Sequence, residues 1–359
     1  MDQRSESTSA FSSAVPLMRE GGRAAGRYVA LLTAIVGLLF AAACLPILVQ
    51  DSDHFTAISR PGSASWYQDL GGNYVTEIQD QDLFYHNIGR SIDYARGADI
   101  IILGSSLVSF GVNEEVVRER LETPYGLKFY NMAFVGVASG EFVRRIIQKN
   151  DLHPRLWIIN ADDGGGGGNF FRRNVTRAFG ADVKQIPAVS YGAARARYEV
   201  IRRNLRWRVE QISVAKWLAP PRAGVIPMFY RSDVTGAADM SGFPHMLEAG
   251  NPRVKMTRDP DCHTSPEVIA SARDLVKSLG APVVLTLVPN FHGCLTQMRE
   301  VAKAVGLEVA EPGRTDYSSW DGGGHLDKAG SVAFTNDLVA ALEKTSAFQS
   351  MSRSDAGRR

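Results

Sequence analysis

From residue 98 onward, short apolar runs alternate with helical patterns, and this alternation narrows the possible folds more than any other feature of the chain. The run Asp99–Leu103 is apolar after its first residue and ends at Gly104, which is typical of a strand buried on both faces. Further strands are predicted at 128–133, 156–159, 283–288 and 307–310, and helices at 113–121, 139–147, 265–279, 295–305 and 328–344. Such strand–helix–strand repeats form a parallel sheet covered by helices, so we predict an α/β fold.

Residues 188–260 interrupt the alternation. A long helix is predicted from Tyr191 to Trp217, followed by a stretch punctuated by proline and glycine as far as Pro260. We interpret the segment as an insertion that shapes a substrate surface. The predicted organisation is a disordered cytoplasmic tail at 1–27, a transmembrane anchor at 28–50, a juxtamembrane segment at 51–97, the α/β domain at 98–345 and a disordered tail at 346–359.

An uncharged apolar segment near the N-terminus predicts the cellular compartment. It runs from Val29 to Val49, which is 21 residues and enough for a helix to cross a bilayer. Arginines precede the segment and aspartates follow it, so the positive-inside rule places the N-terminus in the cytoplasm and the rest outside. We therefore expect a single-pass protein of a bacterial cytoplasmic membrane, with its C-terminal domain in the periplasm or outside the cell.

Two other interpretations of this segment remain open. Ala41–Ala43 has the composition of a signal-peptidase site, and Cys44 follows a sequence that is a poor lipobox. The apolar run continues beyond Cys44 and is long for a signal peptide, which favours an anchor that is not cleaved.

Composition excludes some classes of protein. Apolar residues make up 45% of the 359 residues and charged residues 22%, as in a globular protein with one large domain. A net charge of +2 is too small to suggest nucleic-acid binding. The arginines between Arg195 and Arg208 are interleaved with apolar residues, which indicates the solvated face of an amphipathic helix.

The three cysteines are too few for a disulfide scaffold. Cys44 lies in the apolar segment, so Cys262 and Cys294 form the one pairing available to the outer domain, and the sequence leaves open whether they pair. Asp259, Asp261 and His263 crowd around Cys262, but their spacing matches no metal-ligand pattern, and we predict a polar loop without a metal.

Three side chains combine into a candidate nucleophilic site. Ser106 directly follows a predicted buried strand, where its hydroxyl is presented at the carboxyl edge of the sheet. A serine nucleophile needs a base, and the base is often oriented by a carboxylate. The segment Trp320–Leu326 supplies Asp321 and His325 in one loop. His292, after the strand at 283–288, is an alternative base.

These motifs resemble the SGNH/GDSL hydrolase superfamily. Gly104-Ser105-Ser106 is similar to the family's Gly-Asp-Ser block, Asn131–Gly136 to its second block, and Asp321–His325 to its final Asp-x-x-His block. The resemblance implies a flavodoxin-like three-layer α/β/α sandwich with Ser106 as nucleophile. It also implies an oxyanion hole built from the N–H groups of Ser106 and Gly136 and the side chain of Asn160.

The chain departs from the family pattern in two places. Asp321 and His325 are separated by four steps instead of three, so a Ser–His dyad is an alternative to the triad. In the third block Asp162 stands where the family has the oxyanion-hole asparagine, and Asn160 comes two positions early. Gly164–Gly168 follow, either as a lid or as a plain flexible loop.

The resemblance is greatest to membrane-tethered proteins that assist acylation of surface polymers, such as the D-alanyl-transfer and alginate acetylation proteins. It implies a serine esterase or O-acyltransferase that needs no cofactor and acts on acyl, typically acetyl, esters of a cell-surface polysaccharide. A membrane-bound O-acyltransferase is the implied partner. The alternative is a catalytically weak or inactive binding protein in an acylation or export assembly. The acyl donor, the acceptor and the oligomeric state are left open.

Overall fold

The computed structural model describes eleven stretches of the chain: residues 25–39, 66–70, 84–85, 90–134, 140–161, 170–171, 229–239, 253–255, 262–291, 293–314 and 316–356. Two compact units are present, Met1–Asp51 and Ser52–Arg359, and each is described by itself. The predicted helix Tyr191–Trp217, with its arginines, lies outside the described residues.

The first unit contains one described helix, over residues 25–39. Its apolar side chains, among them Leu31 and Leu38, are exposed. Within the described residues, no helix is both long enough and apolar enough to span a bilayer. The predicted anchor covers residues 28–50. Residues 40–50 of that segment lie outside the described part of the chain.

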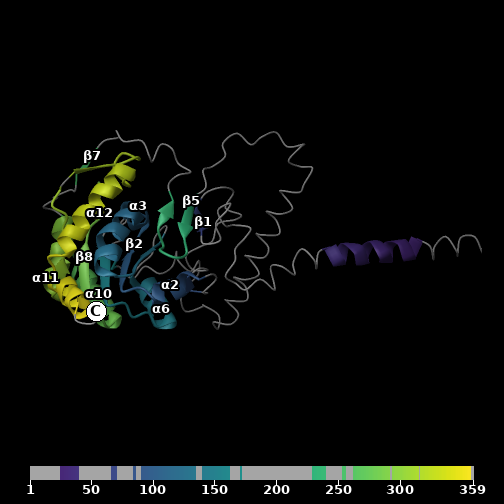
Figure 1. Ribbon diagram of the computed structural model, residues 1–359, viewed down its shortest axis with the longest axis horizontal. Helices are drawn as coiled ribbons and strands as arrows, with labels where there is room; N and C mark the ends of the chain where they lie inside the picture. The colour runs from purple at the N-terminus through teal and green to yellow at the C-terminus, as the bar shows by residue number, and fades with distance from the viewer. Residues whose placement is uncertain are drawn as a thin grey trace, which may run out of the picture. The chain divides into compact units, whose positions relative to one another are not determined.

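A parallel five-stranded sheet forms the centre of the second unit (Figure 1). In spatial order its strands are β3 (Phe129–Ala133), β2 (Ile100–Gly104), β4 (Leu156–Asn160), β8 (Val283–Thr286) and β9 (Glu308–Val309). Every residue of the first four strands is buried, because helices cover the sheet. The predicted α/β fold with a parallel sheet is confirmed.

The helices around the sheet form two groups. The first comprises α3 (Ser106–Gly111), α4 (Glu114–Val117) and α12 (Lys328–Leu342), in which α12 contacts both of the others. The second comprises α6 (Gly140–Asn150), α10 (Pro266–Leu279) and α11 (Leu295–Val305), in which α10 contacts both neighbours. Shorter pieces are α2 (Ser91–Arg96), the π-helical turn η2 (Arg118–Glu122) and α5 (Thr123–Tyr125).

Side-chain caps fix where several helices begin. The side chain of Asn113 accepts a hydrogen bond from the Val116 N–H at 3.1 Å. Ser265 caps α10 in the same way, and Asp327 caps α12 through the N–H of Gly330 at 2.7 Å. The Asp327 cap starts α12 directly after the loop that contains His325.

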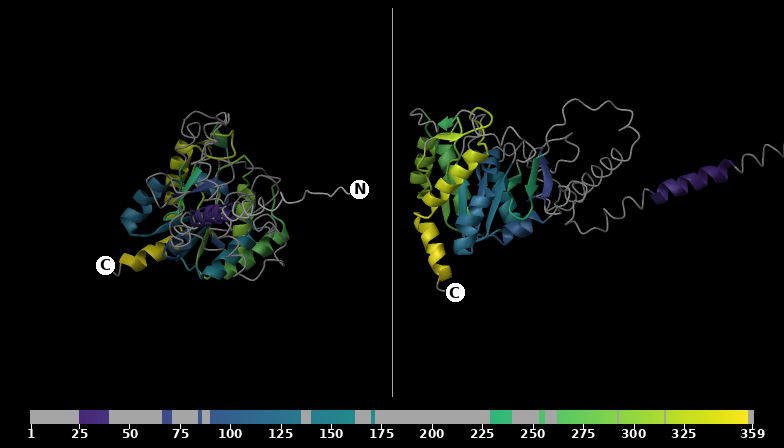
Figure 2. Two further views of the ribbon diagram at one scale, coloured as in Figure 1. Left: turned by 90° about the vertical axis from the view of Figure 1, so that its right-hand side faces the viewer. Right: turned by 45° about the horizontal axis from the view of Figure 1, so that its top comes forward.

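The C-terminal tail differs from the sequence prediction. Residues 346–356 form helix α13 (Ser346–Ala356), visible as the last yellow segment before the C-terminus in Figure 2, so the prediction of disorder there is wrong. The cause is an apolar pair one turn apart: Phe348 and Met351 are both buried. Glu308 also accepts hydrogen bonds from the N–H groups of Ser346 and Ala347.

Part of the segment predicted to be juxtamembrane belongs to the folded unit. Strand β1 (Trp66–Leu70) pairs antiparallel with β5 (Phe229–Ser232), which pairs with β6 (Ala238–Asp239). Phe84 is fully buried, and Ile92 and Ala95 of α2 lie in the same core. The 51–97 segment therefore contributes to the folded unit as well as linking it to the N-terminal region.

The described parts of the 188–260 insertion are strands. The β5–β6 hairpin contacts the edge of the main sheet, where the Asn131 N–H of β3 donates to the Thr235 carbonyl at 2.8 Å. Strand β7 (Arg253–Lys255) pairs antiparallel with β10 (Asp316–Ser318), immediately before the His325 loop. The insertion thus contacts β3 and pairs with β10, and β10 is followed directly by the loop that contains His325.

Cys262 and Cys294 are joined by a disulfide, with their Cα atoms 6.1 Å apart. The bridge links the end of the insertion to the N-cap of α11, since Cys294 precedes Leu295, the first residue of that helix. This settles the pairing that the sequence left open.

Candidate active site

Ser106 lies at the carboxyl end of β2, as its position after the apolar run predicts. It is the first residue of α3, and Ser105 caps that helix by accepting a hydrogen bond from the Leu107 N–H at 3.3 Å. The strand-to-helix turn is too tight for a side chain at Gly104, where an added Cβ would come within 2.3 Å of a methyl group of Val108. The turn leaves the Ser106 side chain partly exposed at the edge of the sheet.

Asp321 and His325 contact each other within one short loop. His325 Nδ1 is 2.7 Å from Asp321 Oδ2. The other carboxylate oxygen, Oδ1, accepts hydrogen bonds from the N–H groups of Gly324 at 2.8 Å and His325 at 2.7 Å. Gly322 and Gly323 have φ angles of 78° and 122°, which favour glycine. These two glycines accommodate the additional residue between Asp321 and His325 without separating the pair.

The side chain of Ser319 stabilises this loop through three polar contacts. Its hydroxyl oxygen accepts a hydrogen bond from the Gly323 N–H at 2.9 Å and lies 2.7 Å from the His325 carbonyl and 3.1 Å from Asp321 Oδ1. Ser319 is fully buried, so these contacts are shielded from water. Ser319 could not be predicted as part of the site, because a serine three positions after Asp316 carries no signal of its own in the sequence.

The electrostatics of Asp321 follow from these contacts. Burial raises its pKa, but the hydrogen bond from the His325 side chain, the His325 N–H and the positive charge that His325 can carry lower it more. The net result is a pKa of about 2, so the group is a carboxylate at neutral pH. A carboxylate at Nδ1 favours the tautomer with a proton on Nδ1 and a lone pair on Nε2.

The fold brings Ser106 and His325 together although 219 positions separate them in sequence. Ser106 Oγ is 3.0 Å from His325 Nε2, which is hydrogen-bonding distance. Two aromatic rings hold the imidazole: Phe110 of α3 meets it edge-to-face at 4.9 Å, and Trp320 stacks on it at 5.8 Å with 18° between the planes. The structure therefore brings together all three side chains that the sequence predicted for the nucleophilic site.

The predicted oxyanion donors have different outcomes. Asn160 is fully buried at the end of β4, beside Gly104, and its Oδ1 accepts a hydrogen bond from the Val288 N–H at 2.7 Å. That bond fixes the amide orientation. Gly136, Asp162 and the glycine run Gly164–Gly168 lie outside the described residues, as does the alternative base His292.

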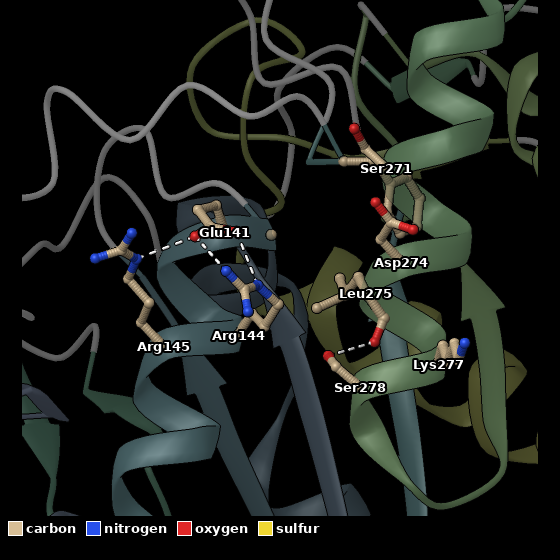
Figure 3. Close-up of a pocket in the computed structure, with 10 residues that line it drawn as sticks. Glu141, Arg144, Arg145, Ser271, Asp274, Leu275, Lys277 and Ser278 are labelled. Atoms are coloured by element: carbon tan, nitrogen blue, oxygen red, sulfur yellow. Dashed lines mark hydrogen bonds and ion pairs between the residues drawn. The ribbon is translucent and has the colours of Figure 1, made fainter. Parts of the chain in front are cut away.

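A separate hollow lies between α6 and α10 (Figure 3) and has a volume of about 570 Å³. Glu141 receives hydrogen bonds from both Arg144 and Arg145 on its wall, and its single negative charge offsets part of their positive charge. None of the three residues of the nucleophilic site lines it.

Comparison with known proteins adds no assignment: no protein-family model matches the chain, and no curated protein matches it. Among the described residues, no group of three or more His, Cys, Asp or Glu side chains is placed to bind a metal ion.

Proposed function

We propose that the protein is a membrane-tethered, extracytoplasmic serine esterase or O-acyltransferase of the SGNH type, acting on acyl esters of a cell-surface polysaccharide. The observation that carries the proposal is the continuous hydrogen-bonded series from Asp321 through His325 to Ser106, with distances of 2.7 and 3.0 Å. A serine, a histidine and a carboxylate in this arrangement perform acyl transfer on several unrelated folds.

The proposed reaction begins with attack of Ser106 Oγ on the ester carbonyl. The Oγ–carbon bond forms as the hydroxyl proton passes to His325 Nε2, and Asp321 stabilises the resulting imidazolium. Collapse of the tetrahedral intermediate breaks the ester bond, and the leaving sugar oxygen takes the proton from Nε2. Water or a second sugar hydroxyl then gives its proton to Nε2 and attacks the acyl carbon. The bond from the acyl carbon to Oγ breaks, and Oγ takes the proton back from Nε2, which regenerates the Ser106 hydroxyl and releases the acid or the new ester.

The oxyanion of each intermediate needs hydrogen-bond donors. The Ser106 N–H at the start of α3 is one proposed donor, and the Gly136 N–H and the Asn160 side chain are the others. The proposed chemistry uses no metal or organic cofactor, because the serine supplies the nucleophile and the histidine transfers the proton.

The sheet supports the proposed fold family. Counted along the chain, the five parallel strands have the spatial order 2-1-3-4-5, which is the flavodoxin-like doubly wound order. Ligands of such sheets bind beyond the carboxyl ends of the strands, where Ser106 and Asn160 lie. The two helix groups are compatible with a three-layer α/β/α sandwich.

The proposed location requires that the Val29–Val49 segment is a single membrane anchor and that the catalytic unit lies outside the cytoplasm. The Cys262–Cys294 disulfide supports this location, because disulfides persist in oxidising compartments and are rare in the cytosol. A surface polysaccharide as substrate and a membrane-bound O-acyltransferase as partner follow from the family resemblance. The alternative of an inactive scaffold would leave the short Ser106–His325 contact without a role.

Hydrolysis of 4-nitrophenyl acetate by the full-length chain in detergent tests the proposal. Ser106→Ala and His325→Ala are each expected to lower kcat at least about a thousandfold. Matched controls are Ser350→Ala on α13 and His153→Ala in an exposed turn, which are expected to keep wild-type rates. Turnover that survives both Ser106→Ala and His325→Ala, or that is absent from the wild-type chain, would contradict the enzyme and favour the scaffold.

A further inference from the structure

Two hydrogen bonds hold the His325 ring at its nitrogen atoms. Nδ1 is 2.7 Å from Asp321 Oδ2, and Nε2 is 3.0 Å from Ser106 Oγ. Neither contact fixes the tilt of the ring about the line through the two nitrogens. The lone pair of Nε2 lies in the plane of the ring, so a tilted ring directs it away from the Ser106 hydroxyl and weakens the hydrogen bond. A flat surface against the ring supplies the constraint that the two hydrogen bonds leave out.

The side chain of Trp320 is such a surface. Its ring stacks on the His325 imidazole at a centroid distance of 5.8 Å, with 18° between the planes, which is an offset-stacked geometry. The Trp320 N–H donates to the His325 carbonyl at 3.3 Å, and the neighbouring Ser319 and Leu326 form an antiparallel bridge. These backbone contacts close the loop at its base, so one constrained turn carries both the indole and the imidazole.

A second aromatic ring comes from the helix that carries the nucleophile. Phe110 of α3 lies four residues after Ser106, is buried, and meets the His325 ring edge-to-face at 4.9 Å. Phe110 also contacts the Trp320 ring at 6.4 Å, with 63° between the planes. The three rings form one cluster, through which Trp320 connects the loop of the base to the helix of the nucleophile.

The stacked indole also suits the charge that the base acquires. In the proposed reaction the imidazole takes the Ser106 proton and becomes an imidazolium. The face of an aromatic ring attracts a cation, and the indole of tryptophan does so most strongly. This attraction is greater in the charged transition state than in the resting enzyme, so it accelerates the reaction itself.

We propose that Trp320 is a positioning residue of the acyl-transfer site, whose indole face fixes the tilt of the His325 ring and stabilises its positive charge during the reaction. The proposal rests on the proposed function and adds a residue that acts through the base. A side chain with a flat π face can take over this role, whereas an aliphatic side chain cannot.

Hydrolysis of 4-nitrophenyl acetate by the full-length chain in detergent compares two substitutions of this side chain. Trp320→Leu is expected to lower kcat about tenfold and to change KM less than about twofold, because loss of one aromatic contact corresponds to about that factor in rate. Trp320→Phe keeps a flat ring and is expected to stay within about threefold of the wild-type kcat. Equal losses in Trp320→Leu and Trp320→Phe, or no loss in either, overturn the proposal.

Tyr94→Leu on α2 is the matched control. It removes a partly buried aromatic ring that contacts the guanidinium of Arg90. Its helix precedes β2, whereas Ser106 follows that strand, so the variant is expected to keep the wild-type rate.

The rate at which a fluorophosphonate labels Ser106 shows whether Trp320 acts through His325. Trp320→Leu is expected to slow labelling about tenfold when His325 is present and less than about twofold in His325→Ala, because a positioning residue has no effect once the base is absent. An equal decrease in both backgrounds would show that Trp320 supports the loop or binds the reagent, and would overturn the proposal. Trp320→Met, which also lacks a π face, replaces Trp320→Leu if that variant does not fold.

Failure of the proposed function gives a different result. If wild-type Ser106 is not labelled, the proposed function fails, and the reaction of His325 with diethyl pyrocarbonate decides the role of Trp320, because this reagent modifies imidazole nitrogens without a serine. Mass spectrometry of the peptide that contains His325 measures the rate. Modification about tenfold faster in Trp320→Leu than in the wild type supports the positioning role, since a released ring exposes Nε2. Equal rates overturn it.

Discussion

The carboxylate of Asp321 holds two different groups with its two oxygens. Oδ2 binds the imidazole, while Oδ1 binds the backbone N–H groups of Gly324 and His325. The side chain therefore shapes the loop and also selects the tautomer of the base. Replacement by asparagine keeps the shape of the side chain but puts an amide where the Nδ1 proton needs an acceptor.

Asp321→Asn is expected to lower kcat about a thousandfold to ten-thousandfold, because an amide that donates to Nδ1 favours the unproductive tautomer. Steady-state hydrolysis of 4-nitrophenyl acetate measures the change. Asp151→Asn is the matched control, since that carboxylate is exposed in a turn. A loss below tenfold for Asp321→Asn would instead favour the Ser106–His325 dyad.

The low pKa of Asp321 also predicts an acid dependence of stability. Its pKa is about 2 in the folded chain and about 3.9 in an unfolded chain, so the unfolded state binds the proton more readily. The stabilisation is complete above about pH 4 and is lost as the pH falls towards 2. Urea unfolding from pH 6 to pH 2 should show the wild-type advantage over Asp321→Asn shrinking below pH 4; an advantage independent of pH would contradict this assignment.

Sequence reasoning found the reacting side chains but not the groups that hold them. Ser106, Asp321 and His325 stand in short motifs that can be recognised in order along the chain. Ser319, Phe110 and Trp320 contact His325 or its loop through tertiary packing, and no local pattern marks them. The four-step spacing was ambiguous in sequence because glycine φ angles decide whether the carboxylate reaches the ring.

Among the elements, the buried strands were the easiest to predict. Runs such as Ile100–Gly104 and Leu156–Asn160 are apolar enough to be recognised without context, and their predicted bounds differ from the structure by about one residue. Helix α3 was not predicted because its six residues are too few to show a helical repeat. Helix α13 was missed because its polar residues outnumber the buried Phe348 and Met351, whose partners are distant in sequence.

Helix α13 is expected to contribute substantially to stability. Ending the chain after Thr345 removes two buried apolar side chains and the hydrogen bond from Arg155 to the Met351 carbonyl. We expect the free energy of unfolding to fall by about 4 kcal/mol, which denaturant titration followed by circular dichroism measures. A chain ending after Ala356 is the matched control and should keep wild-type stability; equal stability of both truncations would contradict the packing of α13.

At the scale of the whole molecule, the inserted hairpin is tied to the main sheet by a buried cation. Arg231 of β5 is fully buried, and it donates to the carbonyls of Asn131 at 2.7 Å and Gly236 at 3.0 Å. Its guanidinium also lies over the Phe84 ring at 5.1 Å. The side chain of Asn131 continues the connection to α3 by donating to the Val108 carbonyl at 3.3 Å.

Arg231→Met is expected to lower the free energy of unfolding by about 3 kcal/mol, because two carbonyl groups lose a charged donor in a buried setting. Thermal unfolding of the full-length chain measures the effect. Arg353→Met is the control, because the side chain of Arg353 on α13 is exposed. Equal midpoints for the two variants would show that the hairpin does not depend on this arginine.

The strands of the 188–260 insertion and their pairing could not be predicted from the sequence. The strands are only two to four residues long, and two of them pair with partners distant in the chain: β5 with β1, and β7 with β10. Such short strands with distant partners leave no local pattern in the sequence. The α/β architecture, in contrast, follows from the alternation of apolar runs and helices, which is local.

The proposed chemistry requires that Ser106 is a nucleophile and that His325, near the other end of the chain, activates it. Reaction of the full-length protein with a fluorophosphonate, followed by peptide mass spectrometry, tests this directly. We predict one covalent adduct on Ser106 in the wild-type chain and a rate of labelling reduced at least a hundredfold in His325→Ala. Absence of an adduct on Ser106, or labelling that proceeds equally fast without His325, would contradict it.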